Sequence, residues 1–159
     1  MEYTPDGKCL IVGYENGMIR YLDLDLIDLE QVNKKVALRD IQEQPGKTSE
    51  KNERPVTLLT VSKDSKWFAT ADPDCGVCLF KKDHKYGDPS EPIEWIFSGK
   101  RRTHEIEITS IAFGEYLDEN EQMKLRLFSI GKDRRLFEYD IYSSTENDNL
   151  KVANVFKIE

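Results

Sequence analysis

The segment ITSIAFGEYLDENEQMKLRLFSIGKDRRLFEYDI, from Ile108 to Ile141, sets the architecture of this chain. Turn-forming residues divide it into three stretches of mostly alternating apolar residues, the pattern of antiparallel β-strands. Two other segments align with it: YTPDGKCLIVGYENGMIRYLDL (Tyr3 to Leu24) and VTLLTVSKDSKWFATADPDCGVCLFK (Val56 to Lys81). Each segment reads as strand, turn, strand, tight turn, strand. The chain therefore contains an internal repeat, which indicates a repeat architecture.

The three segments are aligned on their tight turns, where Asn16, Asp74 and Asp133 are equivalent. Apolar residues follow three and six positions later, and the sixth is followed by a polar residue. These positions hold Ile19, Leu22 and Asp23, then Val77, Phe80 and Lys81, then Leu136, Tyr139 and Asp140. A third strand that closes on an aromatic residue and an aspartate is typical of the blade of a WD-repeat propeller.

The spacing between repeats is longer than usual, because Leu22, Phe80 and Tyr139 are 58 and 59 residues apart. WD repeats usually recur every 40–45 residues, so insertions must account for the difference. Polar, breaker-rich stretches that would form such surface loops are Gln42 to Arg54, Asp83 to Glu94 and Glu115 to Lys124. Fourth strands are expected at Lys35 to Ile41, Trp95 to Gly99 and Leu150 to Ile158. A helix is the competing interpretation between Leu24 and Ile41.

These features predict an all-β fold, a partial WD-repeat β-propeller with two to three four-stranded antiparallel blades. Propellers close with about four to eight blades, so this chain alone cannot close one. We expect an incomplete blade over 1–41 that lacks its first strand, a loop over 42–54, and blades over 55–100 and 101–159. A further part of a longer chain, or a partner, must complete the ring, because an open blade exposes a strand edge.

Composition excludes several classes of protein. The chain has 159 residues, 38% of them apolar and 33% charged, with a formal net charge of -7. This charge repels phosphate backbones, so we expect no nucleic-acid partner. No stretch approaches the roughly 20 apolar residues of a membrane span, and no secretory signal precedes the first repeat, so an intracellular protein without a membrane partner is expected.

Metal and cofactor sites are not expected. Cys75 and Cys78 form a C-x-x-C pair, but His84 and His104 are not spaced to complete a structural zinc site. Cysteines at this spacing on one strand do not share a face, which favours structural thiols, with Cys9 as a third. The carboxylates at Asp118, Glu119 and Glu121 lack the glycine and closing glutamate of a calcium loop, and no glycine-rich phosphate loop occurs.

A group of polar residues in the third repeat has the composition of a catalytic triad but the spacing of a structural network. These residues are His104, Ser129, Asp133 and Tyr139. Ser129 lies four residues before Asp133, and Thr70 lies four residues before Asp74 in the second repeat. A structural role repeats between blades, whereas a nucleophile rarely does, and no G-x-S-x-G elbow surrounds Ser129. We expect a buried hydrogen-bonded chain and no catalytic residue.

Basic residues cluster before the first strand of the third repeat and at its tight turn. They are Lys100, Arg101 and Arg102 in SGKRRTHE, and Lys132, Arg134 and Arg135 in GKDRRL. The two segments belong to the same end of a blade, so their charges can gather there. The competing interpretation is two unrelated solvated loops. If they gather, they form a candidate docking patch for an acidic partner, and such charges set encounter rate more than affinity.

Several of these motifs together resemble a known family. The relevant stretches are His104, FGEYLD (Phe113 to Asp118), LFSIGKDR (Leu127 to Arg134), EYD (Glu138 to Asp140) and KWFATAD (Lys66 to Asp72). They are similar to the propeller of the cilia- and flagella-associated WD-repeat proteins of the calmodulin- and spoke-associated complex. The first repeat matches only a generic WD blade. Members of that family are longer, with further blades and a calcium-binding-like region, so this chain resembles part of such a protein.

The resemblance implies a non-catalytic scaffold of the motile cilium axoneme, at the radial-spoke base and needed for ciliary motility. It implies a location in the cytoplasm, cytoskeleton and cilium axoneme, and axonemal partners such as spoke-base subunits and the tubulin lattice. It carries over no calcium or calmodulin role. The alternative is a WD-repeat adaptor subunit of a non-ciliary cytosolic complex. An enzyme ranks last, because the sequence offers no activated nucleophile, metal set or cofactor loop.

Overall fold

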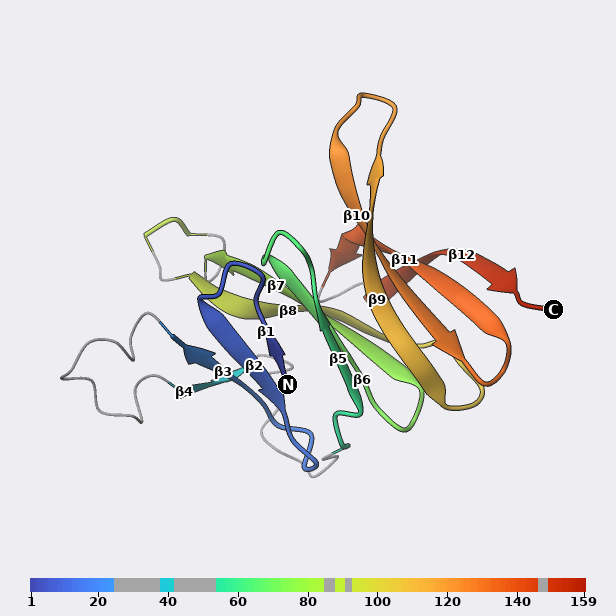
Figure 1. Ribbon diagram of the computed structural model, residues 1–159, viewed down its shortest axis with the longest axis horizontal. Helices are drawn as coiled ribbons and strands as arrows, with labels where there is room; N and C mark the ends of the chain where they lie inside the picture. Colours follow the sequence, from blue (N-terminus) through green and yellow to red (C-terminus); the bar gives the residue numbers. More distant parts are fainter. Residues whose placement is uncertain (25–37, 42–53, 85–87, 91–92, 146–148) are drawn as a thin grey trace.

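The computed structural model describes residues 1–24, 38–41, 54–84, 88–90, 93–145 and 149–159. These residues form three separate four-stranded antiparallel sheets, and within each sheet the strands are neighbours in chain order. Figure 1 shows the sheets arranged side by side, with the second sheet between the other two. The predicted all-β fold with antiparallel four-stranded blades is confirmed. Within the described part of the chain, no helix is long and apolar enough to span a membrane.

The strand bounds follow the repeat. The first sheet holds β1 (Glu2–Tyr3), β2 (Cys9–Gly13), β3 (Ile19–Asp23) and β4 (Leu38–Ile41). The second holds β5 (Leu58–Val61), β6 (Trp67–Ala71), β7 (Gly76–His84) and β8 (Ile93–Arg102). The third holds β9 (Ile108–Leu117), β10 (Met123–Gly131), β11 (Arg135–Thr145) and β12 (Asn149–Lys157).

The structure differs from the sequence expectations at two places. A short first strand is present in the first sheet, because Glu2 and Tyr3 pair with Ile11 and Leu10, where the sequence pointed to a missing strand. The stretch Glu115 to Lys124, expected to be a loop, instead prolongs β9 and β10 as a paired hairpin. Much of the two other expected insertions, and the region where a helix competed, lie outside the described residues; within that region β4 is a strand.

The turn between the first two strands is built in the same way in the first and second sheets. Thr4 Oγ1 donates to Asp6 Oδ1 at 2.6 Å, and the backbone N–H of Lys8 donates to the same carboxylate oxygen. In the second sheet Ser62 and Asp64 repeat these contacts, with Oγ to Oδ1 again at 2.6 Å. In a tight turn some backbone N–H groups have no backbone acceptor, and the aspartate side chains accept from them here. This explains why a hydroxyl residue and an aspartate occur two residues apart in the T-P-D-G-K and S-K-D-S-K motifs.

The tight turn between the second and third strands of each sheet confirms the alignment on Asn16, Asp74 and Asp133. The residue after each of them has a positive φ: 78° at Gly17, 64° at Cys75 and 58° at Arg134. Glycine adopts this conformation freely, whereas the other two residues are held in it by the surrounding turn hydrogen bonds.

Two hydrophobic cores separate the three sheets. Side chains on β6 and β7 alternate between them, because successive strand residues point to opposite faces. Trp67, Ala69, Val77 and Leu79 pack against the third sheet. Phe68, Cys78 and Phe80 pack against the first, around a stacked Phe68–Phe80 pair with ring centroids 4.4 Å apart. The second sheet is therefore covered on both faces.

Candidate functional site

The third repeat contains a continuous chain of hydrogen bonds that is buried at its centre and partly buried at its two ends. Nδ1 of His104 lies 2.9 Å from Oδ1 of Asp133, and Nε2 lies 2.8 Å from Oγ of Ser129. Ser129 Oγ lies 2.8 Å from the Tyr139 hydroxyl, which is 2.6 Å from Oγ1 of Thr103. With a neutral imidazole, the donors run in one direction from Thr103 to the Asp133 carboxylate, and each group is satisfied.

Hydrogen bonds that join serine, histidine and aspartate also occur in the active sites of serine hydrolases. There, however, the serine hydroxyl is accessible to the substrate. His104 is 2% exposed, Ser129 1% and Tyr139 2%. The serine hydroxyl also contacts the tyrosine hydroxyl on its remaining side. A substrate could reach this hydroxyl only if the sheet opened. The network therefore joins β10 and β11 to the segment between β8 and β9, which carries Thr103 and His104.

The protonation of Asp133 and Tyr139 follows from burial and hydrogen bonding. Burial raises the pKa of Asp133, but hydrogen bonds from His104 and from the N–H groups of Glu105 and Arg135 outweigh it, so the pKa lies below its ordinary value. Burial raises the pKa of the Tyr139 hydroxyl, and its hydrogen bonds to Ser129 and Thr103 offset only part of this effect. Asp133 is thus held as a carboxylate and Tyr139 as a neutral phenol.

Gly131 makes room for the network. A Cβ at this position would lie 2.5 Å from Nδ1 of His104 and 3.0 Å from Oδ1 of Asp133. Neither atom can move without breaking the hydrogen bond between them. Neither Gly131 nor Thr103 stood out in the repeat pattern. The glycine that precedes the tight turn and the hydroxyl residue before the histidine were the available signals.

The second sheet has no equivalent chain within its described residues. Thr70 is buried on β6 at the place of Ser129, but Phe80 stands where Tyr139 supplies a hydroxyl. The Asp74 carboxylate is about half exposed and pairs with Arg54 at 2.7 Å. Asp72 closes the turn instead, because its Oδ1 accepts from the N–H groups of Asp74 and Gly76. The structure thus does not bring Thr70 and Asp74 together in a network of this type.

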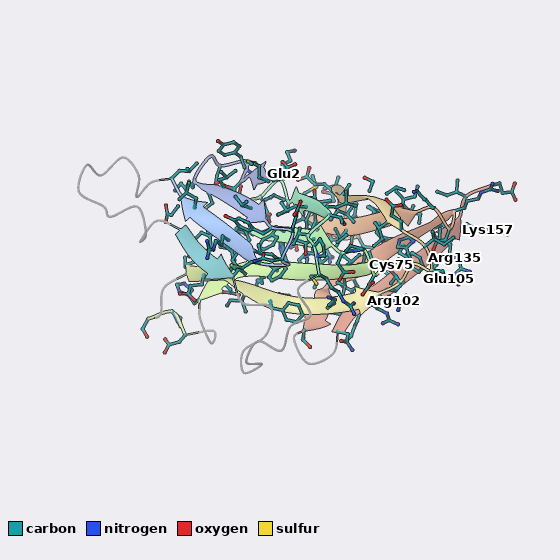
Figure 2. The ribbon with its side chains drawn as sticks, turned by 90° about the horizontal axis from the view of Figure 1, so that it is seen from below. Glu2, Cys75, Arg102, Glu105, Arg135 and Lys157 are labelled. Atoms are coloured by element: carbon teal, nitrogen blue, oxygen red, sulfur yellow. The ribbon has the colours of Figure 1, made fainter. Side chains whose placement is uncertain are left out.

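The six basic residues of the candidate docking patch lie at one end of the second and third sheets. The N–H of Thr103 donates to the carbonyl of Cys75 at 3.3 Å, and that of Lys132 to the carbonyl of Glu107 at 3.0 Å, which ties the segments together. Figure 2 shows Cys75, Arg102, Glu105 and Arg135 at this end. We call it the turn end; it comprises 72–75, 100–107 and 131–135.

Acidic neighbours neutralise half of this patch. Lys100 pairs with Asp72 at 2.9 Å, Lys132 with Glu107 at 2.5 Å, and Arg135 with Glu105 at 3.0 Å. Arg101, Arg102 and Arg134 are exposed and take part in none of the ion pairs found among the described residues. These three guanidinium groups are therefore the ones that can meet an acidic surface.

The cysteines and carboxylates of the described residues form no group of three or more that could hold a metal ion. Cys9, Cys75 and Cys78 are buried, and none of the three forms a disulfide. Cys75 belongs to the core facing the third sheet and Cys78 to the core facing the first, so the C-x-x-C pair is split between two interfaces.

Comparison with known proteins gives relatives along the whole chain. No family model matches the sequence. Cilia- and flagella-associated protein 251 of Tetrahymena thermophila is 35% identical over 172 aligned positions, which cover 100% of this chain and 16% of that protein. The protein of the same name from Mus musculus is 31% identical over 159 residues, covering 100% of this chain and 10% of that protein. The chain thus spans only a small part of these relatives.

Solved structures with the same architecture include WD40 repeats and a β-propeller domain. The WD40 repeats of RRP9 superpose with a TM-score of 0.58 at 14% identity, over 98% of this chain and 37% of that one. A putative 6-phosphogluconolactonase from Bacteroides uniformis superposes with a TM-score of 0.54 at 14% identity, over 99% of this chain and 40% of that one. At these identities the likeness shows the fold alone, an unclosed segment of a β-propeller.

Proposed function

We propose that this chain is part of a non-catalytic scaffold of the motile cilium axoneme, at the radial-spoke base, where it is needed for ciliary motility. The observation that carries the proposal is the similarity, along the whole chain, to cilia- and flagella-associated proteins of a ciliate and a mammal. The match includes the first repeat, which by sequence pattern alone is a generic blade. The whole propeller, with blades beyond these three sheets, is the acting unit.

The non-catalytic part of the proposal is supported by the third sheet. Its histidine, serine and aspartate are joined in the order of a hydrolytic triad, but the serine is 1% exposed and bonded on both sides. Such a network holds β10 and β11 against the segment that precedes β9, which is a structural use of the same groups. A rigid blade of this kind presents its turns as a docking surface.

The docking surface that we propose is the turn end. Arg101, Arg102 and Arg134 stand there on a rigid frame without neutralising partners among the described residues. Guanidinium groups bind carboxylates with two parallel hydrogen bonds, so an acidic protein surface is the matching partner. Spoke-base subunits and the acidic face of the tubulin lattice are candidates of this class. The chain's overall charge of -7 makes this local excess of cations distinctive.

The test is to localise the tagged full-length protein in a ciliated cell and to identify the proteins extracted with it from axonemes. Enrichment with spoke-base proteins, together with impaired beating after its removal, is the expected result. Absence from cilia, with the protein held in a cytosolic complex, would reject the ciliary role in favour of the adaptor alternative. The propeller fold would stand in either case.

A further inference from the structure

The third sheet carries an insertion that the first two sheets lack. In the second sheet Ser62 and Trp67 close the turn between the first two strands and are five residues apart. Their ladder equivalents in the third sheet, Gly114 and Arg126, are twelve residues apart. The connection is thus seven residues longer, and it forms a hairpin over Glu115 to Lys124, which Figure 1 shows extending beyond the sheet between β9 and β10. We call it the projecting hairpin.

The projecting hairpin is an ordered element. Three ladder pairs continue into it, the last of them Leu117 with Met123. At its tip the Asp118 carboxylate accepts from the N–H groups of Asn120 and Gln122 at 2.9 and 2.8 Å. At its base the Arg126 guanidinium stacks 3.8 Å from the centroid of the Tyr116 ring, and Glu115 pairs with Lys63 of the second sheet at 3.0 Å. These contacts hold the tip in a fixed position.

The tip exposes two large apolar side chains opposite each other. Leu117 is 62% exposed and Met123 60%. Closing the turn does not require these apolar side chains, because polar side chains close the equivalent turns of the other two sheets. Adjacent exposed apolar groups on an ordered projection mark a site of contact with another surface.

Ring closure does not explain this pair. Because side chains alternate along a strand, Leu117 and Met123 share the face of Leu125, which packs toward the second sheet. The next blade of a propeller would cover the opposite face, which carries Arg126 and Phe128. The apolar pair therefore remains exposed after further blades are added.

The charges around the pair define its partner. Asp118 is engaged by its own turn and by Lys124 at 3.9 Å, and Glu115 is paired with Lys63. Glu119 and Glu121 are exposed and form no ion pair among the described residues. The tip is therefore apolar with an excess of negative charge. Its complement is an apolar segment flanked by lysine or arginine.

We propose that the projecting hairpin is a second docking site, which binds an apolar, lysine- or arginine-flanked segment of another protein through Leu117 and Met123. This site is independent of the proposed ciliary role. It lies at the opposite end of the third sheet from the turn end, and it selects the opposite charge. Both sites on one rigid blade would let the protein bridge an acidic surface and a basic one.

The first experiment uses the full-length protein and a fluorescent peptide of alternating lysine and valine residues, with a glutamate–valine peptide for comparison. The Leu117→Ser/Met123→Ser variant keeps the tip's charge and removes its apolar surface. It is expected to bind the basic peptide about tenfold more weakly or worse, because two apolar contacts are lost. The control variant Tyr3→Ser/Met18→Ser, altered at exposed apolar side chains of the first sheet, is expected to bind as the wild type does.

Equal binding by the wild type and the Leu117→Ser/Met123→Ser variant, preference for the acidic peptide, or no binding would overturn the proposal. Thermal unfolding of each variant confirms that the fold is retained. A charge variant, Glu119→Lys/Glu121→Lys, gives a separate readout and is expected to weaken basic-peptide binding while leaving the apolar pair intact.

A second experiment places a photoreactive benzoylphenylalanine at Leu117 of the full-length protein in a ciliated cell. The expected crosslink joins the hairpin to a different polypeptide, at an apolar stretch beside lysine or arginine. Crosslinks found only within the same chain, or only to a second copy of it, would reject the site. A crosslink to a non-axonemal protein would support the site while counting against the ciliary role, so the two proposals fail separately.

Discussion

The hydroxyl of Ser129 serves two buried partners, Nε2 of His104 and the hydroxyl of Tyr139, both at 2.8 Å. A Ser129→Ala substitution would leave both of them without this partner in a dry interior. Buried polar groups that lose a hydrogen bond cost about 1–3 kcal/mol each. We therefore expect the free energy of unfolding of the propeller, measured by urea titration, to fall by about 2–4 kcal/mol.

The matched control is Ser110→Ala on the neighbouring strand, where the serine is exposed and a change within about 0.5 kcal/mol is expected. If Ser129→Ala proved as mild as Ser110→Ala, the buried chain would not stabilise the sheet.

Asp133 gives the third sheet a dependence on pH. Its pKa in the folded protein lies below the ordinary value of 3.8, so the folded state binds fewer protons than the unfolded chain as pH falls toward that value. The stability that it contributes is present above 3.8 and is lost as pH falls through the folded-state pKa. The advantage of the wild type over Asp133→Asn should therefore shrink between about pH 5 and pH 3 in urea titrations. A constant difference across this range would contradict the assignment.

The residues of the network show what sequence can predict at this scale. Repeat spacing groups His104, Ser129, Asp133 and Tyr139, and the structure joins them through hydrogen bonds in one continuous chain. The same spacing wrongly suggests equal partners for Thr70 and Asp74. Whether a chain of hydrogen bonds forms depends on every member, and the phenylalanine at the equivalent place in the second sheet cannot supply the hydroxyl that Tyr139 does.

At the scale of elements, the outer strands of the second and third sheets meet closely at Gly99. Its φ is 145°, and a Cβ there would lie 2.8 Å from the backbone nitrogen of Leu150 on β12. Gly99→Val would have to separate the two strands and adopt an unfavourable backbone conformation. We expect a loss of about 2–4 kcal/mol in the free energy of unfolding, measured by urea titration.

Gly7→Ala separates the two causes of that loss. Gly7 also has a positive φ, 72°, but no atom lies within 4 Å of the position that a Cβ would occupy there. Its substitution should cost only about 1 kcal/mol. Equal losses in the free energy of unfolding at both glycines would mean that the backbone conformation, and not the contact with β12, causes the loss at Gly99.

The projecting hairpin shows why one element escaped sequence analysis. Polar residues and breakers between Glu115 and Lys124 have the composition of a loop, and only the alternation of Leu117, Met123 and Leu125 distinguishes paired strands. Three ladder pairs are too few for a period-two pattern to stand out. The strands of the blades themselves are predictable because longer apolar alternation recurs three times.

For the whole molecule, charge placement is the testable feature. Arg101→Glu/Arg134→Glu in the full-length protein should slow association with a polyglutamate peptide by about tenfold at low salt, because exposed cations steer an acidic ligand. The effect should diminish as salt screens the charges. Stopped-flow fluorescence at two salt concentrations measures both.

The control for this prediction reverses two exposed lysines at the other end of the sheets, Lys8→Glu/Lys66→Glu, with the same change in net charge. If this variant slowed association equally, net charge and not the turn end would govern the encounter. The repeat assigns the two basic segments to the same end of a blade, which leaves open whether their charges gather or remain in separate solvated loops. It does not predict their partial neutralisation by Asp72, Glu105 and Glu107, because ion pairs depend on side-chain positions.

The alternation of β6 and β7 between two cores also bears on how such a sequence can change over evolutionary time. Trp67 and Ala69 belong to the core shared with the third sheet, while Phe68 between them belongs to the core shared with the first. A substitution at an odd position of this strand therefore changes the packing against the third sheet, and one at an even position changes the packing against the first. Compensating changes should link Trp67 and Ala69 with β9 to β12, and Phe68 with β2 and β3. Adjacent residues of a single strand can then vary independently of each other. The residues at each interface between two sheets are expected to vary together, separately from those at the other interface.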